Sequence, residues 1–360
     1  MSDRESEPLE RAVLDALRTV KDPDLHKDIV SLNFIKTLRV DGGKVSFAIE
    51  LTTPACPVKQ DMERWAREAV AKVPGVREVE IQMTAAVRQA KKGPSLELLA
   101  KVKNIIAVGS GKGGVGKSTV TANLAVGLAL SGAKVGLLDA DIWGPNIPLM
   151  MGIDGQPRSM DNRIQPLANH GVSVMSMGFL AAPDTPIIWR GPMLHNVMQQ
   201  FLSQVEWGEL DYLLIDLPPG TGDVQLTLTQ TVPLTGAVVV TTPQDVALQD
   251  ARKAILMFRQ VKVEVLGLVE NMSYFQCPHC QARTDIFSHG GAEETAERFG
   301  VPFLGEIALD VAIRQGGDRG RPVVIGAPES PVARAFMQVA RMMAAQVSIA
   351  ASGSVDMIIQ

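Results

Sequence analysis

The sequence contains few of the residues that mark several common classes of protein. Aromatic residues make up 4% of its 360 residues, which disfavours a surface that stacks nucleic-acid bases. The formal net charge is −4, so the chain lacks the basic excess that attracts nucleic acid. The three cysteines, Cys56, Cys277 and Cys280, are too few and odd in number for a disulfide framework. We therefore expect no nucleic-acid partner and a reducing compartment.

Long hydrophobic runs are also missing. No uncharged apolar run approaches the roughly 18 residues that a membrane span requires. The most apolar stretch, residues 332–351, carries Arg334 and Arg341. The first ten residues, MSDRESEPLE, are rich in charged and acidic side chains, which is not typical of a signal peptide. We expect a soluble, cytoplasmic protein with no membrane partner.

The overall composition predicts a folded chain of more than one domain. Hydrophobic residues make up 46% and charged residues 21%, a balance typical of globular proteins. At about 150 residues per domain, the length predicts two or three domains.

Residues 1–87 are predicted to form a small α+β domain. Asp41-Gly42-Gly43 separates two strand-like stretches and is a hairpin signal. The mixture of charge, Gly and Pro in residues 88–103 favours a linker. The expected elements are a helix at 9–20, strands at 35–40 and 44–51, a helix at 62–73 and a strand at 76–83.

Residues 104–360 are predicted to form an α/β domain with a mostly parallel sheet flanked by helices. Apolar runs alternate with helical stretches, as in βαβ crossovers. The expected strands are 105–108, 135–138, 172–175, 212–215, 237–240, 265–269 and 301–304, and the expected helices include 117–130, 194–205, 246–261 and 292–299.

The strongest motif is a phosphate-binding loop at residues 111–119. It fits G-x-x-x-x-G-K-[ST] directly after an expected strand and directly before an expected helix. Lys117 is expected to reach the β- and γ-phosphates of a nucleotide, and Ser118 to hold Mg²⁺. The same glycines match the dinucleotide pattern G-x-G-x-x-G, but the Lys-Ser-Thr tail does not belong to it. The expected nucleotide-binding residues are Gly111, Gly113, Gly114, Val115, Gly116, Lys117, Ser118 and Thr119.

Lys112 is a second lysine inside this loop. It is either a solvated charge or a cation directed at phosphates, including those of a partner subunit. The pattern K-G-G-x-G-K-[ST] is similar to that of the deviant Walker A ATPases, in which the first lysine reaches across a dimer interface.

Acidic residues end two of the expected strands. Asp139 and Asp141 follow one strand, and Asp216 follows another. Carboxylates at the carboxyl ends of parallel strands face the ligand crevice. Asp216 is expected to bind Mg²⁺ through water, Asp141 to orient the attacking water, and Asp139 to support the Mg²⁺ shell. Residues 216–223 would form a loop that senses the γ-phosphate.

The sequence contains no N-K-x-D motif, the usual reader of guanine, so ATP is the expected nucleotide. Asn271 follows the expected strand 265–269. It is either an adenine contact or a simple turn residue.

Cys277-Pro278-His279-Cys280 is predicted to be a metal-ligand pair in a loop. A redox dithiol and a zinc half-site completed by His279 or His289 are alternatives. A four-thiolate site requires two chains, because Cys56 lies in a different domain. A symmetric dimer supplies all four ligands, for a [4Fe–4S] cluster or for zinc.

Together these motifs resemble the Mrp/ApbC iron–sulfur cluster carriers, a branch of the MinD-like deviant Walker A ATPases. The N-terminal region is similar to the MIP18-type domain of cluster-assembly factors, through Asp22-Pro23-Asp24 and the segment TTPACP at 52–57. The motifs that carry the main resemblance are KGGVGKST at 112–119, DADIWGPN at 139–146, WRGPM at 189–193, LIDLPPGTGD at 214–223 and ENMSYFQCPHC at 270–280.

The resemblance implies a homodimer that binds a transient [4Fe–4S] cluster, hydrolyses ATP slowly and delivers the cluster to apo-proteins. Apo iron–sulfur clients and cluster scaffold proteins are the implied partners. Cys56 is either a transient thiolate ligand or a small buried hydrophobe. The family roles correspond to Lys112, Lys117, Ser118, Asp141, Asp216, Cys277 and Cys280.

Three other functions remain open on the residues. A positioning ATPase of the MinD/ParA kind would bind membrane through a basic amphipathic C-terminal helix, whereas residues 332–349 carry only two arginines and favour core packing. A nitrogenase-reductase-like electron donor would use widely spaced cysteines. A zinc-bridged scaffold would use the same cysteines without ATP-driven transfer.

Overall fold

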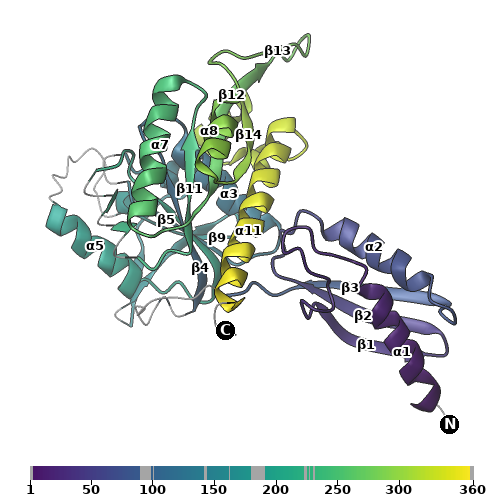
Figure 1. Cartoon of the computed structure of the whole chain (residues 1–360). Helices are drawn as coiled ribbons and strands as arrows, with labels where there is room; N and C mark the ends of the chain where they lie inside the picture. The colour runs from purple at the N-terminus through teal and green to yellow at the C-terminus, as the bar shows by residue number, and fades with distance from the viewer. Residues whose placement is uncertain are drawn as a thin grey trace. The chain divides into compact units, whose positions relative to one another are not determined.

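The computed structural model of this chain describes residues 3–356 except 90–98, 100, 142–143, 162, 180–190, 223–224, 227 and 230–231. The chain divides into two compact units, residues 1–88 and 89–360. Each unit has its own sheet and its own hydrophobic core (Figure 1).

The N-terminal unit packs two helices against a three-stranded sheet of order β1-β2-β3. β1 and β2 are antiparallel, which confirms the predicted hairpin, and β2 and β3 are parallel. Gly42 and Gly43 form the turn with φ of 53° and 88°, a region that favours glycine. The elements are α1 (Asp3–Leu17), β1 (Ile35–Asp41), β2 (Lys44–Leu51), α2 (Lys59–Ala71) and β3 (Glu78–Ala85).

The second unit is built on a nine-stranded sheet of order β13-β12-β11-β4-β10-β5-β9-β8, with β14 also paired to β12. The strands from β12 to β9 are mutually parallel, as predicted, while β8 and β13 pair antiparallel. The strands are β4 (Val102–Gly109), β5 (Val135–Asp139), β8 (Leu167–Asn169), β9 (Val172–Ser176), β10 (Leu210–Asp216), β11 (Gly236–Thr241), β12 (Val265–Gln276), β13 (Arg283–Thr284) and β14 (Phe303–Leu309).

Helices cover both faces of this sheet (Figure 1). α3 packs against α11, and α7 packs against α8. A small separate hairpin joins β6 (Arg158–Met160) to β7 (Arg163–Gln165). The helices are α3 (Lys117–Leu130), α4 (Ile147–Met151), the 3₁₀ turn η2 (Met177–Phe179), α5 (Gly191–Gln204), α7 (Asp245–Gln260), α8 (Gly291–Phe299), α9 (Val311–Asp318), α10 (Val323–Gly326) and α11 (Pro331–Asp356).

Several predicted boundaries were wrong, and the largest error concerns β12. This strand continues to Gln276 instead of ending at Val269, because its second half pairs with β14 and forms a hairpin with β13. Its polar residues made that extension resemble a loop. β14 begins at Phe303 and not at Val301. β4 begins at Val102, so the expected linker overlaps the first strand by two residues.

α11 packs its apolar side into the core, as its spacing predicts. The residues that repeat along this side are all buried, and no membrane-surface role is needed to explain them. They are Val332, Phe336, Val339, Met343 and Val347. In the part of the chain that the structure describes, no helix has the length and apolarity required to cross a bilayer.

Candidate functional site

The loop between β4 and α3 takes the shape of a phosphate cradle. Gly116 ends the loop with φ of 83°, where a side chain would be strained. Gly111 lies against α7, and a Cβ at this position would come within 2.2 Å of the Asp250 backbone. The loop opens at the N-terminus of α3, whose partial positive charge favours anions.

Asp216, the last residue of β10, is the centre of the polar site. It is fully buried and accepts hydrogen bonds on both carboxylate oxygens. Lys117 Nζ and Ser118 Oγ donate to Oδ2 over 2.7 and 2.6 Å, and Thr121 Oγ1 donates to Oδ1 over 2.7 Å. The structure thus brings together Lys117, Ser118 and Asp216, the three residues expected to hold Mg²⁺ and the phosphates.

Asp141 completes this group from the other side. Its Oδ2 lies 3.8 Å from Lys117 Nζ, and only 8% of the residue is exposed. Asp139 is fully buried and makes different contacts. Its Oδ1 accepts from the backbone N of Asp141, and its Oδ2 accepts from Ser176 Oγ over 2.9 Å. Oδ2 also accepts from the backbone N of Ile147.

The surroundings of Asp139 make it a positioning residue more than a metal ligand. Burial and the nearby charge of Asp216 raise the pKa of Asp139 to about 8. Both of its oxygens are occupied by donors from β9 and from the segment after β5. Asp139 also does not line the phosphate pocket. This disfavours the expected direct support of the Mg²⁺ shell.

A pocket of about 200 Å³ lies directly above the loop. Lys112 is half-buried at its rim, and Ser110 Oγ donates to the Lys112 carbonyl O over 3.0 Å. The pocket is lined by Ser110, Lys112, Gly113, Gly114, Gly116, Lys117, Ser118, Thr119, Asp141, Asn146, Met150 and Pro219. The lysine ammonium groups, the serine hydroxyl and the carboxylate suit a magnesium-bound polyphosphate.

A second pocket of about 390 Å³ continues from the first one. The two share Gly116, Thr119, Asn146 and Met150. The second is more apolar, and the carboxyl end of β14 and helix α9 form its far wall. Its remaining lining residues are Leu149, Asn271, Met272, Ala308, Leu309, Asp310, Ile313, Arg314, Gly317 and Asp318. A pocket of this size and polarity fits a nucleoside beside its phosphates.

Asn271 reaches this pocket from inside β12 and not from a turn after it. The residue is 4% exposed, and its Nδ2 donates to the carbonyl O of Val115 over 2.8 Å. The side chain therefore joins the phosphate loop to the wall of the second pocket. Its interpretation as a simple turn residue is wrong, because Asn271 pairs with Ile307 in the sheet.

Cys277 and Cys280 lie at the end of the β12–β13 hairpin, which projects from the helices of its unit (Figure 1). A tight turn closes the hairpin: Cys277 N donates to Ala282 O, and Gln281 N donates to Cys277 O. Cys277 is partly buried and Cys280 is exposed. Hydrogen bonds from the backbone of Cys280 and His279 and from the Cys280 thiol lower the pKa of Cys277. This favours the thiolate, the form that ligates metals.

His289 is not a partner of this cysteine pair in the described structure. Its Nδ1 lies near Ser273, Glu306 and Arg283 at the root of the hairpin. The expected zinc half-site with His289 therefore has no support from its contacts.

Cys56 lies in a different environment in the N-terminal unit. It packs against that unit's hydrophobic core. Burial raises the pKa of this thiol to about 11, and the charges of Asp22 and Asp24 act in the same direction. These surroundings favour the buried-hydrophobe interpretation over that of a thiolate ligand.

Parts of three expected motifs lie outside the described residues. They are Ile142 and Trp143 of the second motif, Trp189 and Arg190 of WRGPM, and Asp223 of the loop after β10.

The sequence analysis missed two hydroxyls that hold the acidic residues. Thr121 follows Lys117 by four positions, so one face of α3 carries both side chains to Asp216. The helical spacing was sufficient to find it. Ser176 ends β9, which pairs with β5 at Asp139. The order of the strands was needed to find this residue.

The fold and this site define the chain as a P-loop NTPase of the MinD-like class. A family described as NUBPL iron-transfer P-loop NTPase matches residues 101–344, and a family described as iron–sulfur cluster assembly protein matches residues 10–82. The MinD protein of Pyrococcus horikoshii, complexed with Mg-ADP, has a TM-score of 0.52 and 26% identity over 66% of this chain and 94% of that one.

The chain belongs to the iron–sulfur cluster carrier family. The iron–sulfur cluster carrier protein of Synechocystis sp. is 52% identical over 346 residues, which is 94% of this chain and 98% of that protein. The nucleotide-binding protein of Archaeoglobus fulgidus, in complex with ADP and with cobalt, is 45% identical with a TM-score of 0.59. The match covers 67% of this chain and 94% of that one.

Proposed function

We propose that this protein is an ATP-hydrolysing carrier that binds a labile [4Fe–4S] cluster between two chains and transfers it to apo-proteins. Cys277 and Cys280 of each chain supply the four thiolates. The observation that carries the proposal is that β12 connects a residue of the nucleotide pocket to the cysteine turn. Asn271 and Cys277 both belong to β12 or follow it directly.

The nucleotide part of the proposal rests on the converging side chains of the phosphate pocket. Lys117 binds the β- and γ-phosphate oxygens, and Ser118 Oγ with Asp216 holds Mg²⁺. When bound there, Mg²⁺ would supply positive charge to offset the charge that develops on these phosphates. The adenine and ribose occupy the second pocket, where Asn271 and Asp310 offer polar groups.

Asp141 is placed to orient the attacking water. It is close to Lys117, and its backbone is held by Asp139. Water attacks the γ-phosphorus, the bond to the β,γ-bridging oxygen breaks, and ADP and phosphate leave. Lys112 at the pocket rim stabilises phosphate charge, including that of a partner subunit. Turnover is slow until a partner arrives.

The transfer part of the proposal rests on the exposure of the cysteine hairpin. A projecting pair of thiols can meet a second copy and then a client surface, whereas a buried pair could do neither. Four thiolates are the usual ligand set of a [4Fe–4S] cluster, and a two-fold axis supplies them from two chains. We place this carrier in the cytoplasm, with apo iron–sulfur proteins and cluster scaffolds as its partners.

β12 offers a direct path from hydrolysis to the cluster. Asn271 holds the phosphate loop at Val115, and the same strand reaches Cys277 six residues later. Nucleotide-driven movement of the loop would shift Asn271 and, through the strand, the hairpin end. ATP then favours a tight dimer with the cluster held, and hydrolysis loosens the four-thiolate site.

Metal analysis after anaerobic reconstitution tests the cluster site. We expect roughly four irons and four sulfides per dimer, and their loss in Cys277→Ala/Cys280→Ala. Cys56→Ala is the matched control and should retain the iron. Zinc alone, or iron that survives the double substitution, contradicts a bridged cluster.

ATP hydrolysis by a Lys112 variant tests the proposed role of this lysine at the phosphates. Lys112→Ala should lower ATP turnover while the melting temperature stays unchanged, because Lys112 lies at the pocket rim outside the core. Lys134→Ala, an exposed lysine paired with Glu209, is the control. Unchanged turnover in Lys112→Ala counts against a role for this lysine at the phosphates.

A MinD-like positioning role has only the likeness of fold in its favour. Such a role needs a membrane-binding surface, whereas the apolar side of α11 is buried in the core. Sedimentation with anionic vesicles, with and without ATP, distinguishes the two functions. Strong ATP-dependent binding would replace the carrier proposal with the positioning role.

A further inference from the structure

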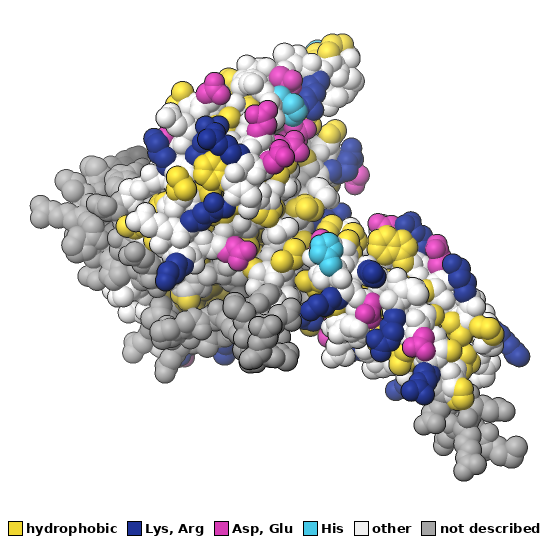
Figure 2. Space-filling view, in the orientation of Figure 1, with side chains coloured by type: hydrophobic (Ala, Val, Ile, Leu, Met, Phe, Trp, Pro, Cys, Tyr) yellow, Lys and Arg dark blue, Asp and Glu magenta, His cyan; other side chains and the backbone are white. Residues whose placement is uncertain are grey.

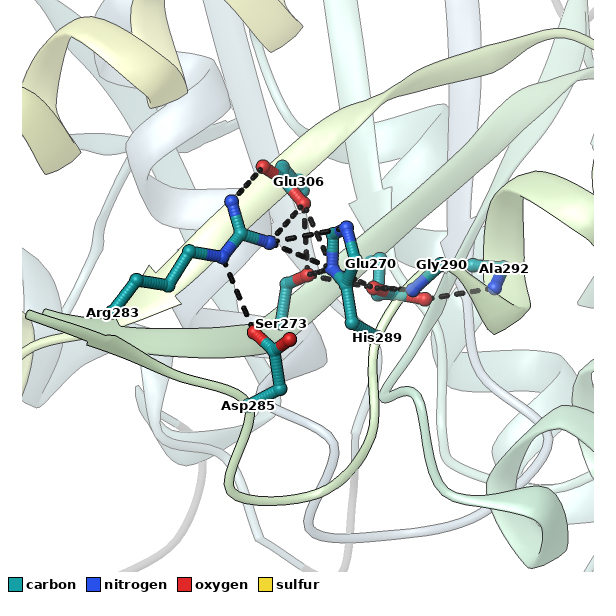
Figure 3. A network of polar contacts seen from close by, with 8 residues as sticks. All are labelled: Glu270, Ser273, Arg283, Asp285, His289, Gly290, Ala292 and Glu306. Carbon is teal, nitrogen blue, oxygen red and sulfur yellow. Dashed lines mark hydrogen bonds and ion pairs between the residues drawn. The ribbon is translucent and has the colours of Figure 1, made fainter.

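A second group of potential metal ligands lies at the root of the cysteine hairpin (Figure 3). Glu270 and Ser273 come from β12, His289 from the segment before α8, and Glu306 from β14. Figure 2 shows acidic, basic and histidine side chains gathered over this part of the unit. Neither the nucleotide pockets nor the cysteine turn includes these residues.

Three of the five distances between their polar atoms match those between ligands of a single metal ion. Ser273 Oγ lies 2.6 Å from Glu270 Oε1, 3.0 Å from Glu306 Oε2 and 3.2 Å from His289 Nδ1. His289 Nδ1 lies 3.3 Å from Glu306 Oε2 and 3.9 Å from Glu270 Oε1. Ligands about 2.1 Å from one metal ion are about 3.0–3.4 Å from each other in octahedral or tetrahedral geometry.

Glu270 is prepared for such a role by its other contacts. The residue is fully buried, and its Oε2 accepts from the backbone N of Ala292 over 2.7 Å. Gly290 N donates to Oε1 over 3.2 Å. These donors come from the start of α8 and fix the direction of the carboxylate. Metal-ligating carboxylates are commonly oriented by hydrogen bonds of this kind.

The group has more acceptors than donors at its centre. The single hydroxyl hydrogen of Ser273 faces two carboxylates and an imidazole nitrogen. Arg283 supplies the positive charge: its Nη2 lies 2.8 Å from His289 Nδ1, and its Nη1 lies 3.3 Å from Glu306 Oε1. Nη2 also lies 3.1 Å from His289 Nε2. A guanidinium only donates, so the ring nitrogen that accepts from it is unprotonated, the form that ligates metals.

Arg283 can leave this position without losing all its partners. Its side chain is 41% exposed, its Nε lies 3.2 Å from Asp285 Oδ1, and its guanidinium stacks 3.9 Å from the centre of the Tyr274 ring. Asp285 and Tyr274 are contacts of Arg283 outside the four candidate ligands. A cation that takes its place would therefore displace an exposed arginine and no part of the core.

We propose that Glu270, Ser273, His289 and Glu306 bind a divalent first-row transition-metal ion in exchange for Arg283. Two carboxylates, one neutral imidazole and a hydroxyl form a hard, mixed oxygen and nitrogen ligand set that suits ions such as Fe²⁺, Mn²⁺ or Zn²⁺. The site is separate from the cysteine pair and does not depend on the proposed function. A bound ion joins β12, β14 and the start of α8, and so stiffens the root of the hairpin.

Cobalt titration of the full-length Cys277→Ala/Cys280→Ala protein tests this site, because that background lacks the thiolate ligands. We expect one Co²⁺ per chain, with the visible absorption bands of a protein-bound ion. Arg283→Gln should bind Co²⁺ more tightly, since the competing cation is gone. A structural ion-pair network would gain no metal affinity from that substitution.

Two substitutions distinguish a proposed metal ligand, Glu306, from Asp285, which contacts Arg283 but is not a proposed ligand. Glu306→Gln should weaken binding by at least the ~10-fold that loss of an outer-shell partner already costs. Asp285→Asn, which removes the other carboxylate beside Arg283, should not weaken it. His289→Gln repeats the ligand test at an exposed position, and melting curves establish that each variant is folded. Absence of bound Co²⁺, or equal affinity in Glu306→Gln and Asp285→Asn, overturns the proposal.

Discussion

The cysteines of the two units lie in different environments, which shift their pKa values in opposite directions. In the N-terminal unit Cys56 packs against a hydrophobic core, and burial raises its pKa to about 11. In the second unit Cys277 and Cys280 stand at the end of a projecting hairpin, where backbone N–H groups lower the pKa of Cys277. The same residue type is thus a packing element in one unit and a proposed ligand in the other. The local environment, and not the cysteine itself, decides which role is available.

Alkylation rates give the largest expected contrast between these thiols. A pKa of about 11 instead of the usual 9.0 leaves Cys56 with about 100-fold less thiolate at neutral pH. Cys277, whose pKa is lowered, reacts faster than an ordinary thiol. We therefore expect iodoacetamide to label Cys277 at least ~100-fold faster than Cys56 in the folded protein.

Mass spectrometry of each cysteine peptide over time measures these rates. The rate at Cys56 should continue to rise up to pH 10, whereas the rate at Cys277 levels off at lower pH. Equal rates at neutral pH would remove the contrast between the two units. Equal rates in denaturant are expected, because unfolding removes both environments.

Replacing a cysteine by serine should destabilise the N-terminal unit more than the second unit. Cys56→Ser places a hydroxyl against the core and should destabilise the N-terminal unit by about 1–2 kcal/mol. Cys280→Ser changes an exposed side chain and should alter stability by less than ~0.5 kcal/mol. Denaturant unfolding checks the first value when it is followed by the fluorescence of Trp65, in the N-terminal unit, with the other three tryptophans replaced by Phe. An unaffected midpoint in Cys56→Ser would place Cys56 outside the core.

The smallest expected effect lies within the hairpin. Backbone hydrogen bonds from Cys280 and His279 are the main causes of the lowered pKa of Cys277, and the Cys280 thiol contributes less. Cys280→Ala keeps the backbone groups and removes only the thiol. The alkylation rate of Cys277 should therefore fall by much less than the difference between Cys277 and Cys56. A fall to the rate of Cys56 would mean that the thiol, not the turn, activates Cys277.

Much of the second unit's fold was predictable from local patterns. The helix after the phosphate loop was predicted at 117–130 and occurs there. Buried parallel strands are continuous apolar runs, so β5 and β10 were located within two residues. The pattern failed at β12, whose last residues are partly buried or exposed although the strand remains paired with β14 and β13. Polarity there reflects a projecting hairpin.

The site was predictable in its chemistry more than in its geometry. The phosphate loop identified Lys117 and Ser118, because the glycines and the lysine must occur at fixed spacing around a phosphate. The different roles of Asp139 and Asp141 depend on which strand lies beside β5. Ser176 occupies one Asp139 oxygen, and that contact joins residues 37 positions apart.

The sequence by itself determined the class of this protein, because the proposed cluster ligands Cys277 and Cys280 lie three positions apart and the phosphate loop is one continuous segment. Short motifs are local, and their chemistry survives without knowledge of the fold. Only the tertiary structure decided which groups meet across the chain. Glu270 and Glu306 lie side by side because parallel pairing of β12 with β14 sets their register, and the segment before α8 brings His289 to them. Such meetings depend on strand order and packing, which no local pattern contains.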